Sequence, residues 1–237
     1  MSRELLDEFS AAIGQLSGDR DVKVIIIRGA GRAFSSGYDL GGGGGGPKTV
    51  DQDRHALQGM IERWLNLRDI PKPVIAMVHG YCLAGATQIC ICSDLTFIAE
   101  NARVGFPSIP AGAGFVSAMR NWQVGPHRTK YMAFLPGSQI SGKEAGDIGF
   151  ATRVFPEDQL EAETYAYARR IVKVPAEKLR LEKLSINRAM DLQGFRSTVL
   201  AGAEYDAIAH FGSASAEVHG VLKERGLKGA IKWYEDQ

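Results

Sequence analysis

The stretch KPVIAMVHGYCLAGATQICICSDLTFIAENARVGFPS, residues 72–108, decides the fold of this chain. Its residues 73–78 form a short apolar run after two prolines, which is typical of a buried strand. We expect the chain to turn at 79–81 and then to begin a helix in the small, apolar segment 83–90. Residues 93–99 predict the next strand. A glycine-flanked helix start after a strand leaves backbone N–H groups that suit a negatively charged oxygen.

The composition is that of a globular, enzyme-sized chain, with 237 residues, 45% apolar and 23% charged. A formal net charge of +1 gives no electrostatic reason to expect nucleic acid or a membrane surface as partner. No apolar run approaches the ~20 residues of a membrane helix, and no signal segment opens the chain. Cys82, Cys90 and Cys92 are odd in number, which favours buried, reduced thiols over a zinc site and predicts a cytoplasmic protein.

Strand and helix patterns alternate along the first part of the chain, and a helical part follows. Ser2 is expected to cap a helix that buries Leu5, Leu6, Phe9 and Ile13 on one face. The further expected elements are a strand at 22–27, a helix at 51–68, a loop at 101–114, short helices at 115–122 and 127–135, a helix opened by a capping box at 141–144, a strand at 151–155, a helix behind Pro156, and helices from Pro175 onward with a break near Gly212. This order predicts an α/β fold with a helical C-terminal region.

Glycine-rich segments raise the possibility of nucleotide binding, which the spacing does not support. Six glycines at 41–46 precede Pro47-Lys48-Thr49, but a phosphate-binding P-loop needs lysine directly after its last glycine. Gly29 and Gly31 lack the third glycine of a dinucleotide fingerprint. The hexaglycine is therefore interpreted as a flexible loop by composition.

Five segments together resemble the crotonase family, the enoyl-CoA hydratase/isomerase superfamily. They are FSSGYDL at 34–40, KPVIAMVHGYCLAG at 72–85, CSDL at 92–95, ARVGFP at 102–107, and the segment from SGKEA at 141 to GFATRVF at 149–155. The resemblance implies a right-handed ββα spiral at 1–174 and a C-terminal helical region at 175–237 that builds homotrimers, often paired into hexamers. The family's N-terminal strand hairpin has no counterpart before Met1, so we expect it to be missing.

The chemistry implied by the resemblance is stabilisation of a thioester enolate by two backbone N–H groups, which fall at Tyr38 and Gly85. The substrate would be an acyl-CoA, with no tightly bound cofactor and no metal. Arg32, Ser36, Tyr38 and Leu40 are the expected contacts to CoA and the acyl group. Tyr38 is bulkier than the alanine usual there, so we expect it to shape the acyl pocket.

The sequence departs from the family at both usual catalytic glutamates, whose positions hold Gln88 and Ser108. Glutamine is uncharged and cannot act as a general base near neutral pH, and serine alone is a poor one. An enzyme that works through an enolate is the favoured interpretation. A non-catalytic acyl-CoA-binding paralogue and a crotonase-type hydrolase remain as alternatives.

Other polar residues have structural interpretations that we prefer. His79, at a strand end, is expected to be packed and bonded to backbone rather than to act as an acid or base. Trp122 is expected to lie in the core. Glu204, Asp206 and His210 share a helix at near-helical spacing, and a solvated face is the preferred interpretation for them.

Overall fold

The computed structural model describes residues 1–39, 49–105, 112, 114–135 and 137–236. Leu40, Ser108 and the hexaglycine lie outside the described residues. The elements that follow one another along the described chain are α1 (Arg3–Gly18), β1 (Ile25–Arg28), α2 (Val50–Asp69), β2 (Val74–Val78), β3 (Tyr81–Leu83), α3 (Ala86–Cys92), β4 (Leu95–Ala99), β5 (Arg103–Gly105), α4 (Ser117–Phe134), β6 (Gln139–Ser141), α5 (Gly142–Asp147), β7 (Arg153–Phe155), α6 (Glu157–Ile171), α7 (Ala176–Leu192), α8 (Phe195–His210) and α9 (Ser213–Glu235).

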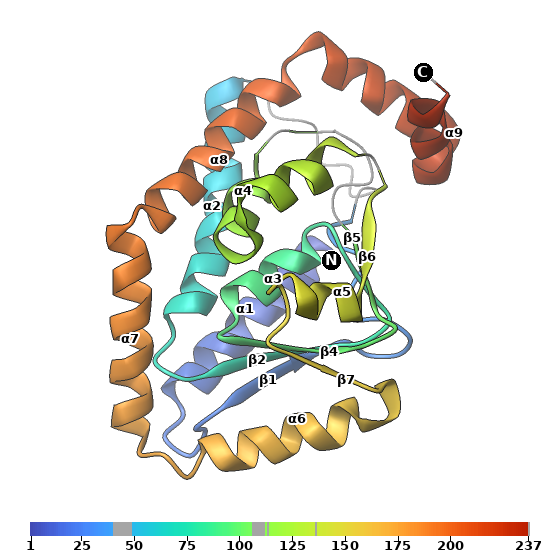
Figure 1. Cartoon of the computed structure of the whole chain (residues 1–237). Helices are drawn as coiled ribbons and strands as arrows, with labels where there is room; N and C mark the ends of the chain where they lie inside the picture. Colours follow the sequence, from blue (N-terminus) through green and yellow to red (C-terminus); the bar gives the residue numbers. More distant parts are fainter. Residues whose placement is uncertain (40–48, 106–111, 113, 136, 237) are drawn as a thin grey trace.

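Two sheets form the centre of the molecule (Figure 1). The larger one is parallel throughout, with the strand order β1-β2-β4-β7, and pairs Ile25 with Val74 and Ile75 with Leu95. All of β2 is buried, as expected for an inner strand of a parallel sheet covered on both faces. In the smaller sheet β3 pairs with β5 in parallel, and β5 pairs with β6 in antiparallel orientation.

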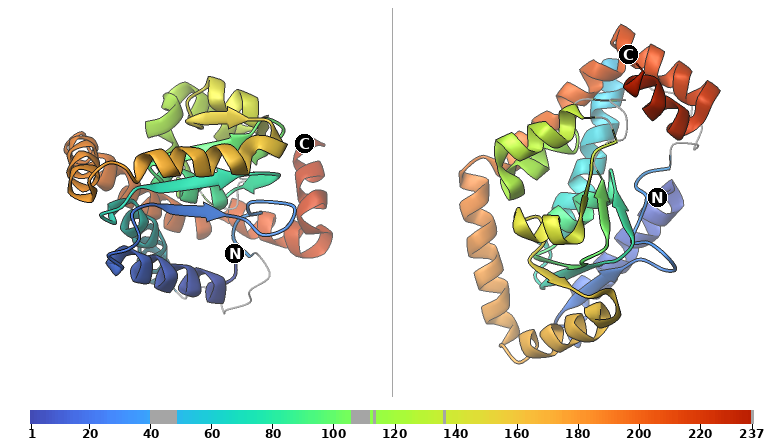
Figure 2. Two further views of the ribbon diagram at one scale, coloured as in Figure 1. Left: turned by 90° about the horizontal axis from the view of Figure 1, so that it is seen from below. Right: turned by 45° about the vertical axis from the view of Figure 1, so that its right-hand side comes forward.

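Helices cover the larger sheet and then run around the outside of the molecule. α6 lies along the larger sheet on the side away from α3 (Figure 1). The two views of Figure 2 show α7, α8 and α9 following one another around the periphery. α8 packs on α2 and α4, and its buried face repeats every fourth residue, with Phe195, Val199, Ala203 and Ala207 fully buried.

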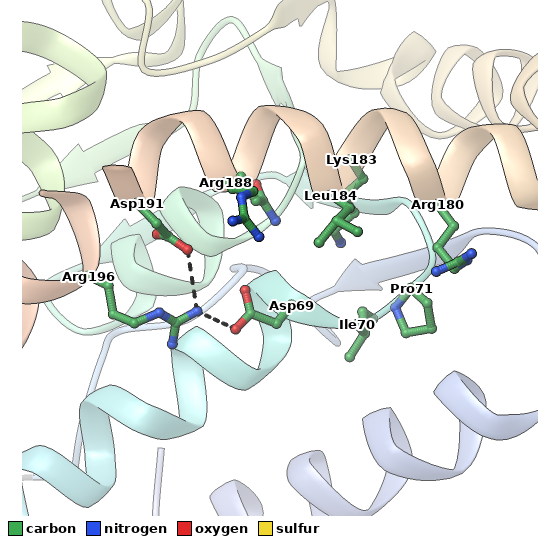
Figure 3. A pocket seen from close by; sticks show the side chains of 10 residues that line it. Asp69, Ile70, Pro71, Arg180, Lys183, Leu184, Arg188, Asp191 and Arg196 are labelled. Atoms are coloured by element: carbon green, nitrogen blue, oxygen red, sulfur yellow. Dashed lines mark hydrogen bonds and ion pairs between the residues drawn. The ribbon is translucent and has the colours of Figure 1, made fainter. Parts of the chain in front are cut away.

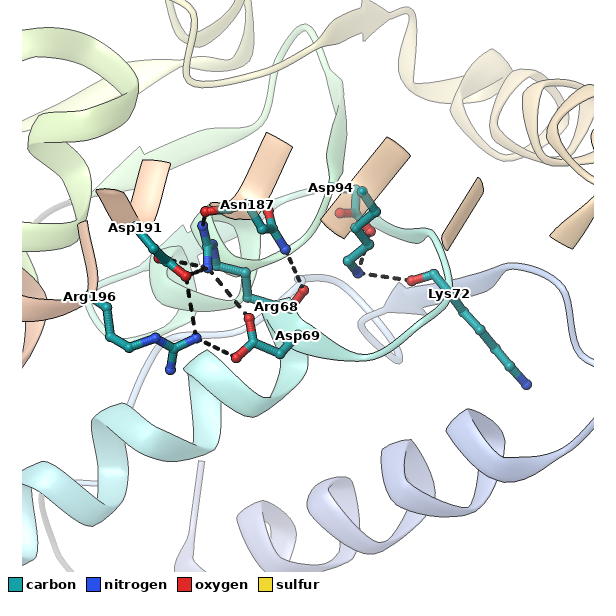
Figure 4. A network of polar contacts seen from close by, with 8 residues as sticks. Arg68, Asp69, Lys72, Asp94, Asn187, Asp191 and Arg196 are labelled. Atoms are coloured by element: carbon teal, nitrogen blue, oxygen red, sulfur yellow. Dashed lines mark hydrogen bonds and ion pairs between the residues drawn. The ribbon is translucent and has the colours of Figure 1, made fainter. Parts of the chain in front are cut away.

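A polar network joins the end of α2 to α7 and α8 (Figure 4). The buried Arg68 guanidinium lies 3.1 Å from an Asp191 carboxylate oxygen, donates to the Asn187 carbonyl at 2.9 Å, and lies 4.5 Å from the centroid of the Phe195 ring. Lys183 of α7 donates to Asp94 at 2.8 Å and to a backbone carbonyl at Lys72. These contacts fix the C-terminal helices against the sheet domain.

Most of the expected elements are confirmed. Ser2 caps α1, accepting from the Leu5 N–H at 3.2 Å, and Ser141 with Glu144 forms the capping box of α5. The two short helices expected at 115–122 and 127–135 are confirmed as the two halves of α4, which non-helical backbone at Gly125 (φ +78°) separates. The strand expected at 22–27 begins later, at Ile25.

Three expectations about local structure are wrong. Tyr81 lies in β3 rather than in a turn, because residues 81–83 pair with β5. The expected loop at 101–114 contains β5, a strand too short to show a periodic pattern. Leu5 is half exposed, since Leu6 and Ile13 are the side chains that α1 buries.

Candidate active site

Pairing between segment 34–36 and β3 brings the two expected N–H groups together. The Ser35 N–H donates to the Tyr81 carbonyl at 2.9 Å, and the Leu83 N–H donates to the Ser35 carbonyl at 3.0 Å. This pairing places the turn at Gly37, with φ +92°, beside the start of α3. A Cβ added to Gly37 would lie 2.8 Å from the Leu83 carbonyl oxygen and 3.3 Å from the Gly85 nitrogen, so only glycine fits.

Gly85 is the N-cap residue of α3, with φ −57° and ψ −21°. Ala84 before it has φ +48°, an uncommon conformation for a residue with a side chain, and its N–H donates to the Gly105 carbonyl at 2.9 Å. Neither the Tyr38 N–H nor the Gly85 N–H donates to a backbone carbonyl within the described part of the chain. Two backbone donors therefore stand close together at the start of a buried helix.

The Tyr38 side chain lies directly on Gly85. A Cβ added to Gly85 would fall 2.3 Å from Cε2 of the Tyr38 ring. The hydroxyl accepts from the Trp64 indole N–H at 2.7 Å and donates to Gln88 Oε1 at 2.6 Å. Burial raises the pKa of the Tyr38 hydroxyl well above its usual value, against the lowering effect of the Trp64 hydrogen bond, so the phenol is neutral near neutral pH.

Gln88 of α3 is fully buried, and its side-chain amide contacts protein groups at both ends. Its Oε1 is taken by Tyr38, and its Nε2 lies 3.5 Å from the Phe115 carbonyl and 3.8 Å from the Met119 sulfur. The residue expected at one of the usual glutamate positions is therefore neutral, and its side chain is hydrogen-bonded to Tyr38. Ser108, the other such position, lies outside the described residues.

Two of the expected CoA contacts line one hollow. Arg32 and Ser36 border a space of about 500 Å³ together with Ala33, Tyr81 and Leu83. Ser36 and Leu83 each lie two residues from a candidate N–H group, at Tyr38 and Gly85. The hollow therefore adjoins the paired segments that carry both donors. Leu40 lies outside the described residues.

His79 and the cysteines have structural surroundings, as expected. His79 Nε2 lies 2.9 Å from the Gly31 carbonyl oxygen. All three cysteines are free and buried, and Sγ of Cys82 lies 3.7 Å from Sγ of Cys90. Burial raises the pKa of the Cys92 thiol to about 12. Buried cysteines without a basic or metal partner are inert packing residues, so these side chains belong to the core.

One polar cluster was not anticipated from the sequence. His210 Nδ1 lies 2.7 Å from Asp53 Oδ2 of α2, and His210 Nε2 lies 3.6 Å from Asp206 Oδ2 on its own helix. Asp53 and Asp206 are buried, so the expected solvated face is wrong for Asp206 and His210, while Glu204 is exposed. No sequence signal links Asp53 to His210, because 157 positions separate them. Within the described ranges no three His, Cys, Asp or Glu residues form a metal-binding group.

A second hollow, of about 390 Å³, lies away from these groups, between the end of α2 and α7 (Figure 3). Arg180, Leu184 and Arg188 of α7 border it, and Arg196 of α8 pairs there with Asp69 at 2.5 Å. It contains none of the expected site residues.

Trp122 is half-buried and packs edge-on against Phe195, with the ring centroids 5.7 Å apart. No helix in the described part of the chain is long and apolar enough to cross a membrane.

The fold and these motifs are those of enoyl-CoA hydratases and isomerases. The enoyl-CoA hydratase/isomerase family model matches residues 1–219, and the chain belongs to this family, the crotonase superfamily. A Mycobacterium tuberculosis protein described as a putative enoyl-CoA hydratase, EchA13, is 32% identical in an alignment of 225 positions. The match covers 84% of this chain and 69% of that protein.

Solved structures agree with this assignment. A crystal structure of a protein described as an enoyl-CoA hydratase/isomerase from Novosphingobium aromaticivorans superposes with a TM-score of 0.93 at 37% identity, covering 99% of this chain and 86% of that one. An enoyl-CoA hydratase/isomerase from Xanthobacter autotrophicus gives 0.90 at 33% identity, covering 98% and 88%. The crotonase-like α/β fold expected from the sequence is confirmed.

Proposed function

We propose that this protein is an acyl-CoA-processing enzyme that stabilises a thioester enolate with the backbone N–H groups of Tyr38 and Gly85. The observation that carries the proposal is the pairing of segment 34–36 with β3, which sets Gly37 so close to the start of α3 that a Cβ added to it would lie 3.3 Å from the Gly85 nitrogen. A pair of donors aimed at developing negative charge in a water-poor site can lower a barrier by several kcal/mol.

Arg32 and Ser36 support a place for CoA in the hollow beside the two donors. An arginine at its rim suits the phosphates of CoA, and the apolar Ala33 and Leu83 suit its pantetheine arm. Tyr38 and Leu40 would contact the acyl group. No resident cofactor or metal is part of the proposed chemistry.

The reaction class is narrowed by Gln88. Hydration by the usual pair of glutamates needs a carboxylate at this position, and Gln88 is neutral and hydrogen-bonded to Tyr38. Deprotonation or isomerisation through an enolate is compatible with two backbone donors and a base from elsewhere. So is thioester hydrolysis, in which water adds to the carbonyl carbon and the tetrahedral oxyanion, held by the same donors, expels the CoA thiolate. A non-catalytic acyl-CoA binder is the second candidate. It is favoured by Gln88, whose side chain carries no charge and is already hydrogen-bonded to Tyr38.

The proposed assembly is a homotrimer or a hexamer of the cytoplasm, with residues 1–174 as the catalytic core and 175–237 as the oligomerisation region. Large apolar side chains on α7 and α8 support it, because a face of this kind is typical of a subunit interface. The exposed ones are Leu181, Leu184, Ile186 and Leu192 on α7 and Tyr205 and Ile208 on α8. Light scattering that gives a monomer at micromolar concentration would refute the proposed assembly.

A panel of 2-enoyl-CoA and 3-enoyl-CoA esters, incubated with the protein in heavy water and followed by mass spectrometry, tests the enzymatic proposal. Water addition, single deuterium exchange, isomerisation and release of free CoA each give a distinct mass or product. We expect at least one of these signals. Binding of the esters without any of them would leave the non-catalytic binder as the correct function.

The role of the Gly85 N–H is tested with two matched variants in a Tyr38→Ala background, where no ring contacts the added atoms. Gly85→Ala keeps the N–H, and Gly85→Pro removes it at a φ that proline accepts. Loss of one such donor typically costs about 100-fold or more in turnover. Equal turnover by the two variants, both folded by circular dichroism, would refute the enolate mechanism.

A further inference from the structure

The side chain of Tyr38 lies across the groups that the proposed function uses. Its ring contacts the Cα of Gly85, since an added Cβ there would lie 2.3 to 2.9 Å from three ring carbons. On the other side, the ring of Phe115 lies 6.2 Å away between centroids, tilted by 54°. One residue therefore supplies both a candidate backbone donor and an aromatic wall beside the other donor.

The Tyr38 ring is held in this position by its hydroxyl. The donor Trp64 and the acceptor Gln88 belong to different helices, α2 and α3, and both side chains are fully buried. Moving the ring outward would break two hydrogen bonds and leave the Trp64 N–H and the Gln88 carbonyl without these partners in the interior. Unsatisfied buried groups are disfavoured, so the observed ring position is the stable one.

The hydroxyl also lies 2.6 Å from the side chain of Gln88. The family resemblance implies that position 88 is that of a catalytic glutamate, which the reacting carbons of the acyl group approach. An acyl chain that extends from the two N–H groups toward residue 88 meets the Tyr38 ring. We infer that Tyr38 determines specificity by restricting the acyl group to a compact one, such as crotonyl or a smaller group, an inference that rests on the proposed acyl-CoA function.

Two substitutions separate the ring from its hydroxyl. Tyr38→Ala keeps the backbone N–H, removes the ring and opens space toward Gln88. Tyr38→Phe keeps the ring and removes only the hydroxyl, so it retains most of the obstruction. Each further methylene that an opened pocket buries is worth about 4-fold in affinity, the equivalent of ~0.8 kcal/mol.

Calorimetric titration with acetyl-CoA, butyryl-CoA, octanoyl-CoA and free CoA tests the inference, with the CoA thiol followed to detect hydrolysis. We expect the wild-type protein and Tyr38→Phe to bind acetyl-CoA at least 10-fold more tightly than octanoyl-CoA. Tyr38→Ala should reverse this order. Tyr165→Ala, which removes an exposed tyrosine from α6, is the matched control and should retain the wild-type order.

The outcomes are distinct. Wild-type protein that binds all three esters equally well would overturn the role of Tyr38 and leave the acyl-CoA function standing. Absence of binding by free CoA and by every ester, to wild type and to Tyr38→Ala alike, would overturn both. If Tyr38→Ala does not fold, the chain-length order of the wild type and of Tyr38→Phe still decides the matter.

Discussion

The hydroxyl of Tyr38 donates a 2.6 Å hydrogen bond to the side-chain oxygen of Gln88 and accepts one from Trp64. The Trp64 indole therefore donates to the Tyr38 phenol, and the phenol in turn donates to the Gln88 amide oxygen. Gln88 suits this chain because an amide carbonyl accepts from a neutral phenol without introducing a charge in the interior. The same pair places a bulky ring beside Gly85, so the local electrostatics and the shape of the site have one origin.

Gln88→Glu is expected to destabilise the protein in a pH-dependent way. A fully buried carboxyl has a raised pKa, so stability falls as the pH rises from the unfolded value of ~4.3 through the folded one. We expect a loss of ~2 kcal/mol at pH 8 and a smaller loss at pH 4.5, measured by urea unfolding. Gln58→Glu, whose carboxylate would accept from Arg54, is the control. An equal loss at both pH values would contradict the neutral network.

Trp64→Phe should lower the free energy of unfolding by about 1–3 kcal/mol, because it removes a buried donor and some core volume. The double-mutant cycle with Tyr38→Phe isolates the hydrogen bond. We expect a coupling energy of about 1 kcal/mol, from guanidinium unfolding of the four proteins. Strictly additive losses would mean that the indole and the phenol do not interact in solution.

Lys183→Met should destabilise the protein by about 1 kcal/mol, because it removes the cation that donates to the partly accessible Asp94 carboxylate at 2.8 Å. Asp94→Asn added to it should recover most of that loss, since asparagine still accepts from the Val74 N–H. Urea unfolding of both variants checks this.

The same pair predicts a pH dependence. Burial raises the pKa of Asp94 more than Lys183 lowers it. The folded state therefore holds more protons than the unfolded chain just above pH 4, and this stability is lost as the pH rises through the folded pKa. Without Lys183 the Asp94 pKa rises further, so the deficit of Lys183→Met should be larger at pH 8 than at pH 4.5. A deficit that is greatest at low pH would disprove this assignment.

Two glycines should respond to alanine in opposite directions. Gly59 lies exposed within α2 with nothing within 4 Å of an added Cβ, so Gly59→Ala should raise stability by about 0.5–1 kcal/mol through helix propensity. A Cβ on Gly142 would lie 1.9 Å from the Ala99 carbonyl oxygen, so Gly142→Ala should cost ~2 kcal/mol or more. Thermal unfolding of both variants measures the shifts, and a stabilised Gly142→Ala would contradict the close approach of α5 to β4.

The sequence alone determined the family, the order of most elements and the identity of the two candidate N–H donors. These features depend on local patterns: the apolar run of β2, the glycines at 37 and 85, and the capping box at Ser141. Such patterns can be recognised without the tertiary structure, because neighbouring residues alone determine the backbone conformation and the hydrophobic periodicity that they reflect. They also gave the expectation that Gln88 stands at the position of a usual catalytic glutamate.

Only the tertiary structure decided what surrounds those residues. It joined Tyr38, Trp64 and Gln88 through bonds that span 26 and 50 positions, and it placed His210 on Asp53. It also showed β3 and β5, which have three residues each. Pairing stabilises these strands, and they are too short to show a periodic sequence pattern. Contacts between distant segments depend on how helices pack on one sheet, and no pattern within a single segment encodes them.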